Sequence, residues 1–238
     1  MKLFVTDYDD TLYTNDPQIK ENIKRLKELQ DNDFIVMIST GRSYPSIKTQ
    51  INLYQIPYDF ISCADGSIIY DKDGQVFWTE YMDTSIIKDF QKFYEKLSFE
   101  EIQFSYEEGY LNYLKDKLLG INICLSSTIY SNKIKSDFYK LKNKYPHYNY
   151  LAYRHPNFSY LCIKPENISK SYAISILIDK LNIKKDDVFV IGDSSNDYEM
   201  LRDFNGVRMT NSKEEIQKTI KIHYDEVSGY IEEILKQE

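Results

Sequence analysis

Residues 1–12 read MKLFVTDYDDTL, a short apolar run that stops at Asp7 and continues into a group of acidic residues. An uninterrupted apolar run of this length, bounded by turn-forming residues, is typical of a strand buried on both faces of a parallel sheet. In such sheets, ligands bind beyond the carboxyl ends of the strands, and Asp7, Asp9 and Asp10 stand at this position. The stretch therefore predicts both a parallel sheet and a polar site at its edge.

Along the rest of the chain, short apolar runs alternate with segments that have helical spacing. Further short apolar runs cover residues 34–38 (FIVMI), 60–62 and 188–191 (VFVI). Apolar residues at helical spacing are found over residues 16–29, 45–54 and 169–181. Strands that alternate with amphipathic helices predict an α/β fold with a doubly wound, parallel-sheet, Rossmann-like core.

Residues 83–155 have a different pattern, rich in Tyr, Phe and Lys. Their strand-like pieces alternate apolar and polar residues, which indicates an antiparallel sheet with one solvated face. We therefore expect a small α+β domain inserted into the core. In this division residues 1–82 and 156–238 form the core, and residues 83–155 form the inserted domain.

Composition excludes several classes of protein. The 238 residues include 30 Lys+Arg and 37 Asp+Glu, for a net charge of −7. An acidic surface repels a phosphate backbone, so we expect no nucleic-acid partner. No stretch approaches the roughly 20 apolar residues of a membrane span, so we expect no membrane association. Cys63, Cys124 and Cys162 are far apart and lack a C-x-x-C motif, which predicts free thiols in a reducing cytoplasm.

Two acidic clusters are expected at the same edge of the sheet. Asp7 and Asp9 follow the first apolar run, and Asp193 and Asp197 follow the run at 188–191. Paired carboxylates normally need a cation, a shared proton or a catalytic use, and Mg²⁺ binds well to one or two carboxylates plus a phosphate oxygen. Taken singly, the first cluster also suits a solvated acidic turn and the second a helix cap. Their joint occurrence favours a Mg²⁺ site.

Two further segments suit phosphate binding. Thr40, Gly41 and Arg42 combine a hydroxyl group, a residue that lets the backbone approach a ligand, and a guanidinium suited to bidentate phosphate contact. A strand-to-helix turn of this composition is also common without a ligand. Lys170 is expected in the first turn of a helix, where the helix dipole disfavours a cation. It is therefore either an exposed surface lysine or a residue that faces an anion bound at the helix N-terminus.

Taken in order, these pieces resemble the motifs of the haloacid dehalogenase (HAD) superfamily, and specifically those of its Cof-type phosphatases. The motifs are Asp7-x-Asp9-x-Thr11, Thr40-Gly41-Arg42, Ser169-Lys170 and Gly192-Asp193-x-x-Asn196-Asp197. The resemblance implies that residues 83–155 are a mobile α/β cap. It also implies a Mg²⁺-dependent phosphatase that hydrolyses a small phosphorylated metabolite, such as a sugar phosphate, through an aspartyl-phosphate.

Roles for individual residues follow from the resemblance by position. Asp7 would be the nucleophile, and Asp9 would protonate the leaving alcohol and then activate water. Thr40 and Lys170 would bind the transferring phosphoryl oxygens. In the implied Mg²⁺ site, the metal is held by Asp7, the backbone carbonyl of Asp9, and Asp193. Asp197 would support either the metal or Lys170. The implied phosphate- and substrate-binding residues are Thr11, Gly41, Arg42, Arg154, Asn196 and Asn211.

The chain departs from the family pattern in two places, mildly at Asn211-Ser212, where the family has Asn-Ala, and more clearly at Asp65. Cof-type enzymes usually carry Asn-Gly-Ala after the third strand, whereas this chain has Asp65-Gly66-Ser67. If residue 65 faces the site, this change brings another negative charge to its mouth. Two other functions stay open: a phosphomutase that uses the same aspartyl chemistry, and a metabolite-binding module that has lost turnover. The short cap argues against the first, and the intact catalytic positions argue against the second.

Overall fold

The computed structural model describes residues 1–83, 86, 90, 101–126, 132–154 and 158–237. The chain forms two compact units. The core unit comprises Met1–Arg42, Ser46–Trp78 and Ser169–Glu238, and the inserted unit comprises Ser43–Pro45 and Thr79–Ile168. Within the described residues, no helix combines the length and the apolar character needed to cross a bilayer.

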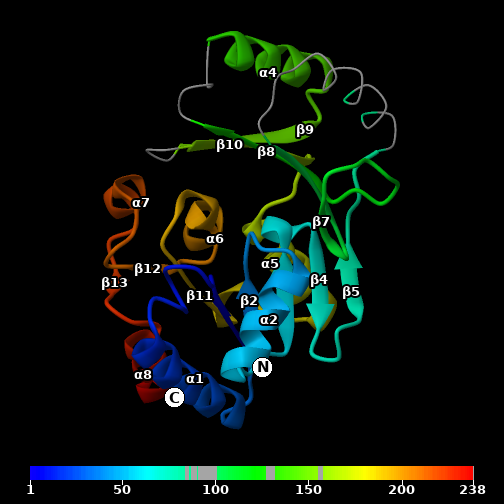
Figure 1. The fold of residues 1–238 in the computed structure, drawn as a ribbon. Coiled ribbons are helices and arrows are strands. Elements are labelled where there is room, and N and C mark those ends of the chain that lie inside the picture. Colours follow the sequence, from blue (N-terminus) through cyan, green and yellow to red (C-terminus); the bar gives the residue numbers. More distant parts are fainter. Residues whose placement is uncertain (84–85, 87–89, 91–100, 127–131, 155–157, 238) are drawn as a thin grey trace. The chain divides into compact units, whose positions relative to one another are not determined.

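An eight-stranded sheet forms the centre of the core unit, with strand order β13-β12-β11-β1-β2-β3-β4-β5 (Figure 1). Its strands are β1 (Lys2–Thr6), β2 (Phe34–Ser39), β3 (Phe60–Cys63), β4 (Ile68–Asp71), β5 (Val76–Thr79), β11 (Val188–Gly192), β12 (Val207–Met209) and β13 (His223–Tyr224). All neighbours from β13 to β3 pair in parallel, and β4 returns antiparallel to β3. In this register Thr6 lies opposite both Ile191 and Ile38, so three strands end together. The predicted parallel α/β core is confirmed, with an antiparallel extension at one edge.

Helices cover both faces of this sheet. They are α1 (Asp16–Asp31), α2 (Tyr44–Tyr54), α5 (Lys170–Leu181), α6 (Tyr198–Asp203), α7 (Glu214–Thr219) and α8 (Val227–Lys236). Leu3 and Val5 of β1 belong to a buried cluster with Ile174 of α5. Phe4 points to the opposite face because side chains alternate along a strand, and its ring lies 6.0 Å from that of Tyr230 on α8. Helix α8 in turn packs beside α1 (Figure 1). The sheet is therefore buried on both faces, as its uninterrupted apolar runs predict.

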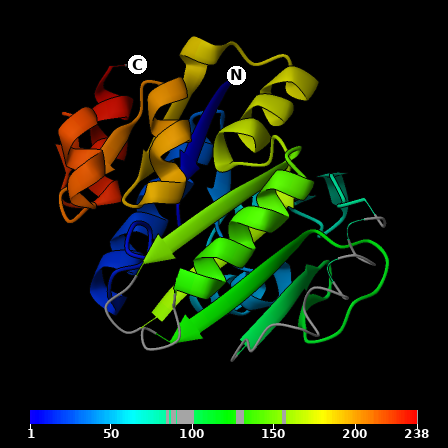
Figure 2. The ribbon, with the colours of Figure 1, turned by 90° about the horizontal axis from the view of Figure 1, so that it is seen from above.

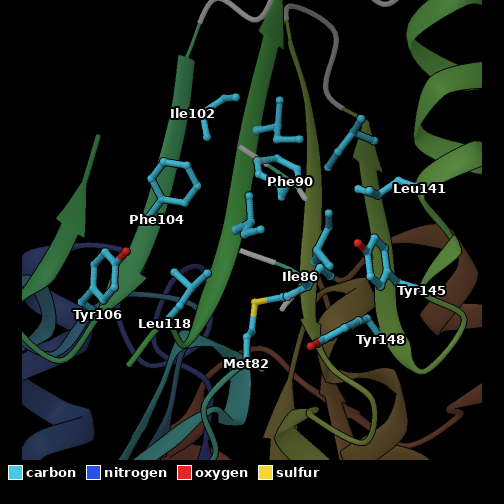
Figure 3. Close-up of a cluster of buried hydrophobic side chains, with 14 residues drawn as sticks. Met82, Ile86, Phe90, Ile102, Phe104, Tyr106, Leu118, Leu141, Tyr145 and Tyr148 are labelled. Atoms are coloured by element: carbon cyan, nitrogen blue, oxygen red, sulfur yellow. The ribbon is translucent and has the colours of Figure 1, made fainter. Parts of the chain in front are cut away.

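The inserted unit has its own sheet and its own core. Its antiparallel strands follow the order β7-β6-β8-β10-β9. They are β6 (Glu101–Tyr106), β7 (Gly109–Leu111), β8 (Gly120–Ser126), β9 (Tyr148–Arg154) and β10 (Phe158–Pro165). Helix α4 (Asn132–Lys144) lies along one face of this sheet (Figure 2). On that face Ile102, Phe104 and Leu141 join a buried cluster with Phe90, whose ring meets the ring of Phe104 edge to face at 6.3 Å (Figure 3). The alternating pattern thus produces the predicted antiparallel sheet.

The second boundary of the inserted unit differs from the division expected at residue 156. Residues 158–165 form β10, which pairs on one side with β8 and on the other with β9. A strand with two hydrogen-bonded neighbours cannot be separated from its sheet, so this unit continues to Ile168. The next residue, Ser169, caps α5 of the core unit with its hydroxyl oxygen, which accepts from the backbone N–H of Tyr172.

Gly66 is a position where the fold depends on the absence of a side chain. It closes the short 3-10 turn Ala64–Gly66 with a φ of +107°, and a Cβ there would lie 2.2 Å from the backbone oxygen of Ser169. We expect Gly66→Ala to lower the free energy of unfolding by about 3 kcal/mol or more, because both the backbone angle and the clash oppose it. Gly229→Ala is the control. Gly229 lies within α8, where helix propensity predicts no loss, and a Cβ there would lie 3.7 Å from a ring carbon of Tyr224, its nearest neighbour outside that helix. Urea unfolding of both variants tests the difference, and equal stabilities would contradict it.

Candidate active site

The loop after β1 folds back on itself at the carboxyl edge of the core sheet. The backbone N–H of Asp7 donates to the carbonyl oxygen of Ile191 on β11, which extends the strand pairing by one residue. Leu12 and Tyr13 then donate back to the carbonyl oxygens of Asp7 and Tyr8. These hydrogen bonds close the turn and hold the side chain of Asp7 against the neighbouring strand end.

Lys170 lies at the centre of the site. Its Nζ donates to Asp7 Oδ1 at 2.5 Å and to Asp197 Oδ1 at 2.6 Å. The lysine side chain and that of Asp197 are fully buried, and the Asp7 side chain is 7% exposed. A buried ammonium is stable only when paired in this way. The structure therefore excludes the exposed surface lysine and brings together residues 163 positions apart.

The electrostatics of this cluster are set by burial and by its two carboxylates. Burial alone would lower the pKa of Lys170, but the charges of Asp197 and Asp7 outweigh it and raise that pKa. Burial raises the pKa of Asp7 well above its usual range, although Lys170 opposes the change. The ammonium is thus held in its charged form, and a cation beside Asp7 favours its carboxylate.

Asp193 and Asp197 occupy different positions within the loop after β11. Asp193 Oδ1 accepts a hydrogen bond from the hydroxyl of Thr11 at 2.9 Å. Both oxygens of Asp197 are engaged, Oδ1 by Lys170 and Oδ2 by the backbone N–H groups of Asp193 and Ser194. Asp197 therefore fixes the loop and orients the lysine. Thr11, expected at the phosphate, contacts the carboxylate of Asp193 instead.

The donor set suits a hard divalent cation. Carboxylate oxygens of Asp7, Asp193 and Asp197 lie within 4.8 Å of one another, and all three residues are buried. Mg²⁺ takes oxygen ligands and commonly uses only one or two carboxylates. Because the oxygens of Asp197 already accept four hydrogen bonds, Asp7 and Asp193 fit the role of direct ligands better than Asp197 does.

Asp9 is held by an arginine from the second loop. Arg42 Nε donates to Asp9 Oδ2 at 2.8 Å, and its Nη2 donates to Oδ1 at 2.6 Å. The guanidinium carbon also lies 5.1 Å from the centre of the buried Tyr8 ring. Arg42 thus makes with Asp9 the bidentate contact expected with a phosphate. Tyr8 is a site residue that sequence reasoning missed, because a tyrosine between two aspartates carries no signal of its own.

Two of the remaining core residues of the expected site, Thr40 and Asn196, contact Asp65. Thr40 is buried, and its hydroxyl oxygen accepts from the backbone N–H of Arg42 at 3.1 Å. Asn196 donates through Nδ2 to Asp65 Oδ1 at 2.8 Å, and its own Oδ1 accepts from the hydroxyl of Ser194. Asn211 lies apart from this group, because its Nδ2 donates to the backbone oxygen of Asp10 at 3.3 Å.

Arg154 is the one expected substrate-binding residue outside the core unit. It is the last residue of β9, and its side chain lies outside the described part of the chain.

Asp193 allows a test of the cation site that does not depend on activity. Burial, with Asp197 adding to it, raises the pKa of Asp193 from 3.8 to about 6. The ionised carboxylate therefore costs folding free energy that grows as the pH rises through this interval and is constant above it. We expect Asp193→Asn to raise the stability of the metal-free protein at pH 7.5 by up to about 3 kcal/mol, and by about half as much at pH 5.

The same variant should lose its response to the metal. Urea unfolding in EDTA and in Mg²⁺ measures both effects: Mg²⁺ should stabilise the wild-type protein and leave Asp193→Asn unchanged. A variant that is less stable than the wild-type protein in EDTA at pH 7.5, or that still responds to Mg²⁺, would contradict this placement of the cation.

Comparison with known proteins agrees with this geometry. The sequence profile of the haloacid dehalogenase-like hydrolase family matches residues 4–146 and 115–228. Phosphatase YwpJ of Bacillus subtilis (strain 168) is 24% identical over an alignment 267 residues long, gaps included, which covers 91% of this chain and 92% of YwpJ. The 5-amino-6-(5-phospho-D-ribitylamino)uracil phosphatase YcsE of the same strain is 23% identical over 229 residues, covering 92% of this chain and 88% of YcsE.

The fold is shared with solved structures of the same superfamily. A sugar phosphatase of HAD subclass IIB superimposes with a TM-score of 0.76 at 16% identity, over 98% of this chain and 99% of its own. The resemblance drawn from the four motifs is thereby confirmed. The chain belongs to the haloacid dehalogenase-like hydrolase family.

Proposed function

We propose that the protein is a Mg²⁺-dependent phosphatase that hydrolyses a small phosphorylated metabolite through an aspartyl-phosphate on Asp7. The observation that carries the proposal is the buried contact between the Asp7 carboxylate and the Lys170 ammonium at the carboxyl end of β1. Family membership and the phosphatases among the relatives support the same activity.

Electrostatics explains why a carboxylate nucleophile needs this lysine. A carboxylate that approaches a phosphate dianion meets two negative charges, each worth about 4 kcal/mol at 4 Å for an effective dielectric constant near 20. The ammonium of Lys170 lies 2.5 Å from Asp7 Oδ1 and offsets part of this repulsion where the bond forms. Attack by Asp7 then releases the alcohol and leaves the phosphoryl group on the carboxylate.

The second step requires water and a base. Asp9, two residues along the same turn, is the group we assign to protonate the leaving alcohol and then to take a proton from water. Its two hydrogen bonds from Arg42 restrict the position of the carboxylate, and Thr40 orders the start of the same loop. We therefore assign Arg42 to positioning Asp9 and Thr40 to the phosphoryl oxygens.

A bound Mg²⁺ would supply positive charge to the phosphoryl oxygens during both steps. Asp7 and Asp193 would hold it with their carboxylates, joined by the backbone carbonyl of Asp9 as the family resemblance implies. Thr11 would orient Asp193 through the hydrogen bond at 2.9 Å, and Asp197 would orient Lys170.

The substrate we propose is a small phosphorylated metabolite, with sugar phosphates as the first class to test. The shared fold of a sugar phosphatase and the phosphorylated ribityl compound in the name of YcsE support this class. Residues 83–155, Arg154 among them, are the part of the chain that we assign to recognition of the leaving group. We place the protein in the cytoplasm, because Cys63, Cys124 and Cys162 are all free thiols.

Hydrolysis of a generic aryl phosphate by the purified protein, with Mg²⁺ or with EDTA, tests the activity. We expect phosphate release in Mg²⁺ and its loss in EDTA. A panel of phosphorylated sugars and other small metabolites then identifies the class of substrate. Isomerised sugar phosphate without free phosphate would indicate a phosphomutase. Ligand-dependent thermal stabilisation without any turnover would indicate a binding module, and either result would contradict the proposal.

A further inference from the structure

Asp65 lies between two loops of the site and contacts both. Its Oδ1 accepts a hydrogen bond from Asn196 Nδ2 at 2.8 Å, and its backbone N–H donates to the carbonyl oxygen of Thr40 at 3.0 Å. A Cβ added to Gly41 would lie 2.8 Å from the same Oδ1. The carboxylate therefore packs directly against the backbone of Gly41 and joins the loop after β2 to the loop after β11.

Backbone geometry does not require an aspartate at this position. Asp65 has φ 49° and ψ 38°, in the left-handed region, and Ala64 beside it has φ 50°. Asn and Asp both tolerate this region. The side-chain oxygen of an asparagine would also accept the hydrogen bond from Asn196. What an aspartate adds over an asparagine is a negative charge.

That charge stands in a site that already has an excess of carboxylates. Among the described residues, the loops of the site carry five carboxylates and two side-chain cations: Asp7, Asp9, Asp65, Asp193 and Asp197 against Lys170 and Arg42. The charge of Asp65 also acts on Lys170 at the centre of the site. Burial and the carboxylates of Asp197 and Asp7 have the larger effects on the pKa of Lys170, and the charge of Asp65 raises that pKa further. A bound Mg²⁺ would offset two of these negative charges and leave a net charge of −1, against which a phosphate dianion must enter.

We propose that Asp65 is a positioning residue whose carboxylate holds Asn196 against the Gly41 backbone and whose charge weakens the binding of inorganic phosphate, so that the product leaves readily. The inference rests on the proposed function, because it takes the Asp7 site to bind a phosphoryl group. It assigns two separable effects to one side chain, a hydrogen bond and a charge.

The charge is tested by Asp65→Asn, which keeps the hydrogen-bond acceptor. We expect the dissociation constant of inorganic phosphate, measured by calorimetry in Mg²⁺, to fall about fivefold, and product inhibition to tighten equally. Asp33→Asn is the matched control. Asp33 is exposed, has φ 61°, and directly precedes β2, at the amino ends of the parallel strands and away from the site at their carboxyl ends. The control should bind phosphate like the wild-type protein. Unchanged or weaker binding by Asp65→Asn would overturn the electrostatic effect.

The hydrogen bond is tested by exchanging the two partners. Asn196→Asp brings two carboxylates together at this contact and should weaken phosphate binding at least tenfold. The double variant D65N/N196D restores a donor and an acceptor across the contact and should recover most of that loss. Because loss of the Asp65 charge alone accounts for about a fivefold gain, a double variant that binds no more than about fivefold better than Asn196→Asp would overturn the positioning role.

Failure of the inference and failure of the proposed function give different results. If the wild-type protein hydrolyses its substrate but Asp65→Asn binds phosphate with unaltered affinity, the inference is wrong and the proposed function stands. Absence of turnover in every protein, with the expected order of phosphate affinities, would remove the hydrolytic function and keep the role of Asp65.

Discussion

Asp7→Asn should lower the rate of phosphate release by at least about 10⁴-fold, because an amide cannot accept the phosphoryl group. The substitution keeps the shape of the side chain and an oxygen that can accept from Lys170, so the fold should be retained. Rapid-quench measurements with a substrate labelled in its phosphoryl group provide a second measure. The wild-type protein should carry label after denaturation, and Asp7→Asn should carry none.

Two further aspartates of the same turn make this experiment specific. Asp10→Asn is the control, because Asp10 is exposed and its left-handed φ of 58° suits asparagine equally well. Its rate should stay within about threefold of the wild-type rate. With an aryl phosphate, whose leaving group departs without a proton from Asp9, Asp9→Asn should accumulate label, since the base for the second step is missing. Full activity in Asp7→Asn, or label on that variant, would disprove the aspartyl-phosphate mechanism.

Lys170→Met should destabilise the protein by about 3–5 kcal/mol at neutral pH, because it leaves the carboxylates of Asp7 and Asp197 buried without their cation. Methionine has a similar length, so lost packing contributes little. The loss should be smaller at pH 5, since Asp7, whose pKa burial already raises, then takes up a proton more readily. Any folded variant should also lose at least about 10²-fold in activity, because the phosphoryl oxygens lose a buried cation.

The chain provides a matched control for the effect of burial. Lys218 and Glu214 form an ion pair at 2.8 Å on α7, with side chains 69% and 82% exposed. Lys218→Met should change the free energy of unfolding by less than about 0.5 kcal/mol, because solvent screens such a pair. Urea unfolding at pH 7.5 and pH 5 measures both variants. A Lys170→Met protein as stable as Lys218→Met would show that the buried cluster contributes nothing to folding.

Much of the fold is readable from the chain because its determinants are local. A strand buried on two faces is indicated by the apolar run before Asp7 and again by the run at 188–191. The alternation of apolar and polar residues within 103–106 indicates a strand with one solvent-exposed face. The identities of the site residues are equally local, since each motif follows a strand directly. Periodicity thus predicted the two kinds of sheet and which loops carry acidic residues.

Periodicity did not decide which sheet a strand joins. Residues 158–165 form an apolar strand that by pattern suits the core, yet its backbone pairs with β8 and β9 of the inserted unit. The pattern within a strand reports how its faces are buried, whereas the choice of neighbour depends on hydrogen bonds to distant segments. The boundary of the inserted unit is therefore a property of the tertiary structure.

The sequence by itself determined the parallel core, the inserted antiparallel unit and the acidic residues at the strand ends, because these depend on near neighbours along the chain. Only the tertiary structure decided how those residues are paired. It buried Lys170 between Asp7 and Asp197, turned Arg42 toward Asp9, and placed Asp65 between Gly41 and Asn196. The physical reason is that charges interact through space: partners 163 or 131 residues apart meet only after the strands that carry them have ended side by side.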